Sequence, residues 1–175
     1  MSDANVPRAK SPHAFMREAL DAQARLRDDR SALILAALDA ESRALVSRTG
    51  YAASEVERYF AARAARIESP RPTLQALGKV MYSAAAFADL ERVFVALEAE
   101  DPTLAANSVA LVAAAISDLA QRPALGRPAE EGLRERVVSR GRPGYVALYR
   151  HLELDDCVLI VAIRHRYAAG YPSTE

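Results

Sequence analysis

The spacing of the apolar residues changes once along this chain, and that change limits the folds open to it. Up to about residue 67 apolar residues recur every three or four positions, which is the period of an α-helix. Beyond about residue 77 several runs alternate apolar and polar residues, as β-strands do. The stretch IESPRP at 67–72 separates the two patterns, and its prolines end a helix and hold the backbone extended. The sequence therefore predicts a helical part, a join and a mixed part.

The N-terminal part is expected to contain two or three helices and no strand over residues 11–67. Ser11 and Pro12 suit a helix start. Apolar residues then follow in 4-3-4 steps, first at Phe15, Ala19, Ala22 and Leu26 and again at Leu33, Ala37, Ala40 and Ala44. This pattern predicts one long helix, or two helices with a bend near 27–31. Because the apolar face is narrow and rich in alanine, the helix needs a partner surface.

A further helix is predicted before the prolines. Gly50 suits the end of the preceding helix, and Ser54 with Glu57 forms a capping pattern for the next. Its apolar face is partly aromatic and ends before Pro70; it consists of Val56, Tyr59, Phe60 and Ile67.

The C-terminal part is predicted to follow the order strand, helix, helix, strand, strand, strand. The expected strands are 77–83, 132–139, 144–152 and 157–165, and the expected helices are 84–100 and 103–121. The last strand is apolar on both faces, so we expect it at the centre of the sheet. The fold class is therefore α+β, with two helices on one face of a twisted, mainly antiparallel sheet.

Composition restricts the functional classes. The 23 basic and 23 acidic residues cancel, which argues against a strong non-specific nucleic-acid or membrane binder. Cys157 is the one cysteine, the first ten residues lack the apolar run of a signal peptide, and no stretch reaches membrane-spanning length, so a cytoplasmic protein is expected. His13 and His151 have no partners at metal-ligand spacing, and no metal or cofactor is expected.

Residues 77–171 resemble the RelE/ParE superfamily of bacterial toxins from type II toxin–antitoxin modules. Four passages in the family's order carry the resemblance: YSAAAFADLERV, ISDLAQRPALGRPAEEGLRERVV, GYVALYR and VLIVAIRHRYAAGY. The resemblance implies a toxin domain over 77–175.

Residues 11–70 resemble the second half of ParD-like antitoxins, in SPHAFMREALDAQARLRDDR and TGYAASEVERYFAARAA. The DNA-binding strand expected before them is absent, so operator binding is not expected. The predicted organisation is a disordered start at 1–10, an antitoxin-like helical segment at 11–69, a linker at 70–76 and the toxin domain. This describes an antitoxin–toxin fusion of the plasmid stabilisation type, docked within one chain or exchanged in a domain-swapped homodimer.

Basic residues near the C-terminus are the candidate target-binding groups. Strand alternation puts Arg134, Arg136 and Arg140 on one face, and Arg164 ends the last strand. They could receive phosphate or an acidic partner, or lie on a solvated face. If the toxin cuts mRNA as RelE-like members do, the resemblance implies catalytic roles for Arg134, His165 and Tyr171.

The antitoxin–toxin contact is predicted to use the apolar face of the N-terminal helices: Phe15, Leu26, Leu33, Tyr59 and Phe60. The favoured function is a ParE-like toxin that acts on DNA gyrase without being an enzyme and is neutralised by its tethered segment. The alternatives are a ribosome-dependent mRNA endonuclease and a degenerate, non-toxic interaction protein. Ala168, where the family often has glutamate, keeps the last alternative open.

Overall fold

The computed structural model of the protein describes residues 12–138 and 144–165; the stretch 1–10 predicted to be disordered lies outside this range. The helices are α1 (Pro12–Ser47), α2 (Ala53–Ala64), α3 (Ala84–Glu100) and α4 (Pro102–Ser117), with 3-10 turns η1 (Asp118–Ala120), η2 (Glu130–Gly132) and η3 (Glu153–Asp155). The strands are β1 (Thr49–Ala52), β2 (Gln75–Ala76), β3 (Val80–Tyr82), β4 (Arg127–Pro128), β5 (Arg134–Val137), β6 (Tyr145–Leu152) and β7 (Cys157–His165).

The described strands form one sheet in the order β2-β1-β3-β7-β6-β5-β4. The pair β3–β7 is parallel and the other pairs are antiparallel. Strand β7 lies between β3 and β6, which confirms its predicted central place. Both edge strands, β2 and β4, have only two residues, so the sheet offers little backbone for pairing with other chains. The α+β class and the order of elements in the toxin-like part are confirmed.

The α3–α4 hairpin begins and turns where the sequence predicts. The Ser83 hydroxyl accepts a hydrogen bond from the Ala86 amide at 3.1 Å and so caps α3. The Asp101 carboxylate accepts from the Thr103 amide at 2.8 Å and caps α4, with Pro102 at the first helical position.

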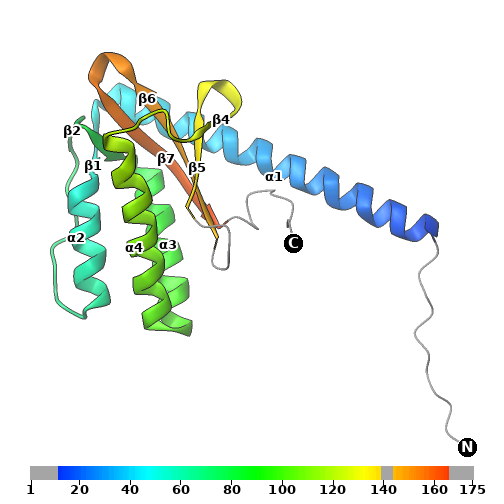
Figure 1. The fold of residues 1–175 in the computed structure, drawn as a ribbon, viewed down its shortest axis with the longest axis horizontal. Coiled ribbons are helices and arrows are strands. Elements are labelled where there is room, and N and C mark those ends of the chain that lie inside the picture. The colour runs from blue at the N-terminus through cyan, green and yellow to red at the C-terminus, as the bar shows by residue number, and fades with distance from the viewer. Residues whose placement is uncertain (1–11, 139–143, 166–175) are drawn as a thin grey trace, which may run out of the picture.

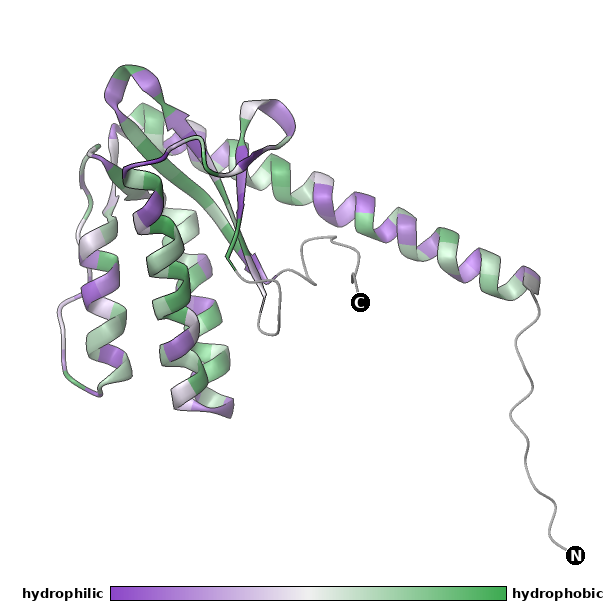
Figure 2. Cartoon of the chain, viewed as in Figure 1, coloured by the Kyte–Doolittle hydropathy of each residue, from purple (hydrophilic) through white to green (hydrophobic). Residues whose placement is uncertain are grey.

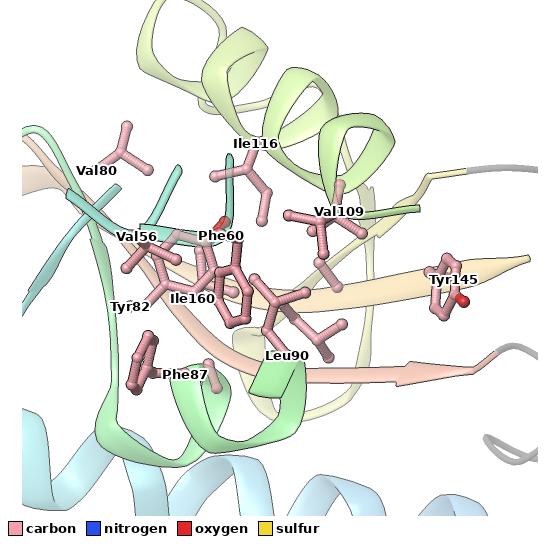
Figure 3. Packing of buried hydrophobic residues seen from close by; sticks show 14 of the residues in the cluster. Val56, Phe60, Val80, Tyr82, Phe87, Leu90, Val109, Ile116, Tyr145 and Ile160 are labelled. Carbon is pink, nitrogen blue, oxygen red and sulfur yellow. The ribbon is translucent and has the colours of Figure 1, made fainter. Parts of the chain in front are cut away.

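Two hydrophobic cores lie on opposite faces of the sheet. One face is covered by α2, α3 and α4, and Figure 3 shows Phe60, Phe87 and Leu90 packed among aliphatic residues from the helices and the sheet. The Phe60 ring centroid lies 5.9 Å from that of Phe87 and 5.4 Å from that of Phe94. The other face is covered by the second half of α1 (Figure 1). Strand β7 is therefore covered on both faces, and its buried side chains divide between the two cores.

The structure corrects the prediction that residues 11–67 contain no strand. Helix α1 ends at Ser47, and β1 follows and pairs with β3. Arg48, at φ 55°, takes the left-handed conformation that we expected at Gly50. Gly50 lies within β1 instead. The signal is easily missed, because TGYA is too short to show alternation.

Helix α1 is one long helix, which is the first of the two alternatives that the sequence left open. Three other boundaries differ. Helix α2 begins directly after β1 at Ala53 without a side-chain cap, so Ser54 does not start it, and it ends at Ala64. The predicted linker 70–76 ends in β2, which pairs with β1.

Residues 102–120 are long and apolar enough to cross a membrane by length and composition. In the fold this segment is mainly α4, which packs on α2 and α3 and buries Val109, Val112 and Ile116. Its buried side chains belong to the core, and 39% of the segment is buried; Figure 2 shows hydrophobic residues along much of α4.

Candidate functional site

The contact between the N-terminal segment and the toxin-like domain is the most extensive candidate site. Helix α1 divides into the arm, residues 12–29, and the docked half, residues 30–47. In the docked half Leu33, Ile34, Ala37, Ala40 and Ala44 are all at most 7% exposed. They pack with apolar residues of β3, β6 and β7, including Met81, Leu148, Leu159 and Val161. The small alanines let the helix approach the sheet closely.

An ion-pair cluster around one buried carboxylate, Glu135, holds the start of the docked half. The Arg30 guanidinium donates to the Glu135 carboxylate at 2.8 Å and to both carboxylate oxygens of Glu130, at 3.0 and 2.6 Å. Arg127 of β4 donates to the other oxygen of Glu135 at 2.6 Å. The Glu135 side chain is only 1% exposed, so its charge depends on these two arginines. The hydrogen bond from Arg30 also lowers the pKa of Glu130.

Two further pairs continue along α1. Arg150 of β6 makes a two-pronged contact with Glu41, at 2.6 and 2.7 Å, and both side chains are mostly buried. At the end of the helix Arg48 pairs with Asp155 of η3 and lowers the pKa of that carboxyl. The ionic contacts thus extend over the whole docked half, from Arg30 to Arg48.

Strand β1 and helix α2 complete the contact. Strand β1 extends the sheet beyond β3, with Tyr51 opposite Tyr82 and Ala52 opposite Met81. Helix α2 packs beside α4 and buries Phe60 completely. Arg63 pairs with Glu98 of α3 at 3.2 Å. The N-terminal segment therefore covers one sheet edge and contributes to both faces.

The predicted contact residues fall into three groups. Leu33 and Phe60 are buried in the two cores. Leu26 and Tyr59 are half-buried, and the Tyr59 ring lies 5.9 Å from that of Phe87. Phe15 is 70% exposed on the arm and does not bury against the domain of its own chain.

Arg134 and Arg136 lie together on the face of β5 that faces away from the docked half. Arg134 donates to the backbone carbonyls of Ala124, at 3.2 Å, and Gly126, at 2.5 Å. Arg136 pairs with Asp118 at 3.4 Å. These two of the four predicted target-binding arginines thus hold the segment that follows α4. Arg140 lies outside the described residues.

Arg164 and His165 end β7 beside a buried carboxylate. Asp89 of α3, 3% exposed, accepts a hydrogen bond from the Ile163 amide at 2.9 Å and pairs with both Arg164 and Arg92. The His165 ring meets the Tyr145 ring edge-on, with centroids 5.5 Å apart. The structure thus brings two arginines and a histidine to one end of the sheet.

The predicted catalytic set is not brought together: Arg134 pairs with Tyr149 and His165 with Tyr145, toward different ends of β6 within the described residues. Tyr171 lies outside them, and the contacts of Arg134 and Arg164 described above are with the protein's own carbonyls and carboxylates. Among the described residues, no cluster of His, Cys, Asp and Glu is suited to a metal ion.

Sequence reasoning missed the ionic part of the contact. The predictions for these helices and strands used the positions of apolar residues and not those of charged ones. The charged residues concerned are Arg30, Glu41, Glu135 and Arg150. Glu135 is on the core-facing side of β5, where alternation predicts an apolar residue, and a charged residue at such a position was the available signal.

Comparisons with known proteins concern the toxin-like part. A chain in the crystal structure of the toxin–antitoxin complex RelBE2 (Rv2865-2866) from Mycobacterium tuberculosis aligns with 52% of this chain and 100% of its own length, at 25% identity and a TM-score of 0.37. Among curated proteins, no sequence matches. The family model described as the ParE toxin of the type II toxin–antitoxin system, parDE, matches residues 80–168, just over half of the chain and all of the span from β3 to β7. The chain belongs to this ParE toxin family.

Proposed function

We propose that this chain is a toxin–antitoxin fusion in which residues 11–69 act as a tethered, antitoxin-like segment on the ParE-type domain. The observation that carries the proposal is the docked half of α1, which covers the sheet face opposite α3 and α4 and is held by Arg30–Glu135 and Glu41–Arg150. A surface sealed in this way cannot meet another macromolecule while α1 stays in place.

The tether favours docking within one chain. Residues 65–74 join α2, which packs on α4, to β2, which pairs with β1. A short connection of this kind gives the segment an effective concentration on the order of millimolar or higher. In this account the domain-swapped homodimer is the alternative that forms when the segment leaves its own domain.

The test compares bacterial growth after induction of three full-length chains. The wild type should be tolerated. The double variant Arg30→Glu and Glu41→Arg puts like charges at both buried pairs, so it should release the docked half and slow growth. The control variant Asp39→Arg and Arg43→Glu reverses an exposed pair on the same helix and should behave as wild type.

Induction of residues 77–175 without the segment extends the test. If this fragment and the Arg30–Glu41 variant are both as harmless as the wild type, although they accumulate in soluble form, the proposal of self-neutralisation fails. That outcome would support the alternative of a non-toxic interaction protein.

Among targets, we favour DNA gyrase over messenger RNA. The supporting observation is that Arg134, Arg136 and Arg164 are engaged by the fold, which leaves a weaker phosphate-binding set than an endonuclease needs. The released variant should inhibit supercoiling by purified gyrase and leave cellular mRNA intact. Cleavage of mRNA, lost with His165→Ala, would instead support the endonuclease.

A further inference from the structure

The arm of α1 extends past the sheet with no other labelled element beside it (Figure 1). Its large apolar side chains are exposed: Phe15 at 70%, Met16 at 62% and Leu20 at 60%. An isolated helix of this length is marginal in water, because its stability comes mainly from packing of its apolar face. Within the described residues, the apolar side chains Phe15, Met16 and Leu20 of the arm therefore have no packing surface opposite them.

The arm repeats the sequence of the docked half. Residues 15–26 read FMREALDAQARL and residues 33–44 read LILAALDAESRA, with Ala-Leu-Asp-Ala and a following arginine in common. The offset is 18 residues, which is five turns of an α-helix, so matching positions project in the same direction. Phe15, Ala19 and Ala22 thus correspond to Leu33, Ala37 and Ala40, which are buried on the sheet. Among the described residues of the arm, Phe15, Ala19 and Ala22 are exposed, and only Leu26, near the docked half, is half-buried.

Among its described residues, a second copy of the chain offers a matching open surface in its own arm. Its sheet face is already covered by its own docked half, whereas its arm presents the same exposed apolar stripe. We propose that two copies of the chain pair through their arms, antiparallel about a two-fold axis. An interface of this kind is isologous, so the same stripe serves both partners.

The arm sequence is self-complementary in this arrangement. Placing Phe15 opposite Leu26 of the second copy sets Ala19 opposite Ala22, so large residues meet at the two ends and small residues at the centre. Glu18 and Arg25 flank the stripe on one side, seven residues apart. Each Glu18 then faces Arg25 of the second copy, which gives two opposite-charge pairs across the axis.

The length of the arm fits the same arrangement. Its 18 residues span about 27 Å. The second arm would therefore lie along the whole of residues 12–29 and end near Arg30, which contacts Glu130 of η2. The pairing leaves the contact within each chain intact, so it is independent of the proposed function and of domain swapping.

Sedimentation equilibrium of the full chain tests the pairing. The wild type should dimerise at concentrations on the order of tens of micromolar. Glu18→Arg and Arg25→Glu, each alone, should raise the dissociation constant by about tenfold or more, and the two together should restore it. Arg43→Glu, at the repeat position that matches Arg25 but on the docked half, should leave it unchanged.

Cross-linking fixes the geometry, in a background where the buried Cys157 is replaced by alanine. A mixture of Ala19→Cys and Ala22→Cys chains should form disulfide-linked dimers faster than either chain alone. A wild type that stays monomeric to about 100 µM overturns the proposal. So does a dimer that neither charge reversal weakens, or one in which the mixed chains do not cross-link preferentially.

Discussion

At the scale of single residues, Glu135 is the side chain on which the contact depends most. It is a carboxylate on the core-facing side of β5, and the side chain is 1% exposed. Arg30 reaches it from α1 and Arg127 from β4. A buried charge is tolerated only when it is paired and hydrogen-bonded, so each of the three residues requires the others.

Glu135→Ala should destabilise the protein strongly, because it leaves the Arg30 and Arg127 guanidiniums without their shared partner. We expect a loss of about 2–4 kcal/mol in the free energy of unfolding, measured by urea denaturation. Asp39→Ala, which removes a partner from an exposed pair, should change it by less than about 0.5 kcal/mol. Equal effects of the two variants would mean that the Glu135 cluster contributes no more than a surface ion pair.

At the scale of elements, the approach of β1 to β3 decides whether the N-terminal segment is part of the sheet. The two strands pair over Tyr51 and Ala52. Gly50 passes so close to β3 that a Cβ atom there would lie 2.9 Å from the Tyr82 carbonyl oxygen and 3.2 Å from the Met81 Cβ. The glycine is thus required by the space available between neighbouring backbones.

Gly50→Ala should therefore push β1 away from β3. We expect a loss of about 1–3 kcal/mol in unfolding free energy and faster hydrogen exchange of the β1 amides. Gly78→Ala is the matched control, since the nearest atom to its Cβ is the flexible Met81 sulfur at 3.7 Å. If both alanine variants are equally stable, the contact at Gly50 relaxes without loosening β1.

At the scale of the whole molecule, docking of α1 controls access to one face of the sheet. Cys157 reports on it, because the thiol is 0% exposed in the core beneath α1. Burial raises the pKa of this thiol to about 11. Because the pKa of the folded thiol is raised, the thiol stays protonated and weakly nucleophilic at pH 8. Burial of the protonated thiol stabilises the fold fully below the pKa of the unfolded thiol, about 8.5. This contribution to the free energy of unfolding is lost as the pH rises from there toward the folded pKa.

Labelling of the Cys157 thiol in the full chain by a disulfide reagent at pH 8 should be slow, because the docked half of α1 must first separate from the sheet. In the Arg30→Glu and Glu41→Arg variant the docked half separates more often, so labelling should be faster by about tenfold or more. The Asp39→Arg and Arg43→Glu variant should label at the wild-type rate. Equal rates in all three chains would show that access to Cys157 does not require α1 to leave.

The sequence by itself determined the local order of this protein. The caps at Ser83 and Asp101 mark the starts of α3 and α4, and the uninterrupted apolar run of β7 predicts a central strand, because these signals depend on neighbours in the chain. The family followed from passages within residues 77–171, and its model matches residues 80–168. The face of α1 that packs on the sheet was also readable, since Leu33, Ala37, Ala40 and Ala44 share one helical stripe.

Only the tertiary structure decided how the N-terminal segment joins the domain. Strand β1 is a strand because the β3 edge supplies its hydrogen-bond partners, and four residues carry no pattern of their own. The Arg30–Glu135 pair joins residues 105 positions apart, and such distant charges meet only when the chain is folded. The two halves of α1 carry the same stripe, yet one is buried and the other exposed. The difference lies outside the helix, because the sheet lies beneath the docked half, from Arg30 onward, and not beneath the arm.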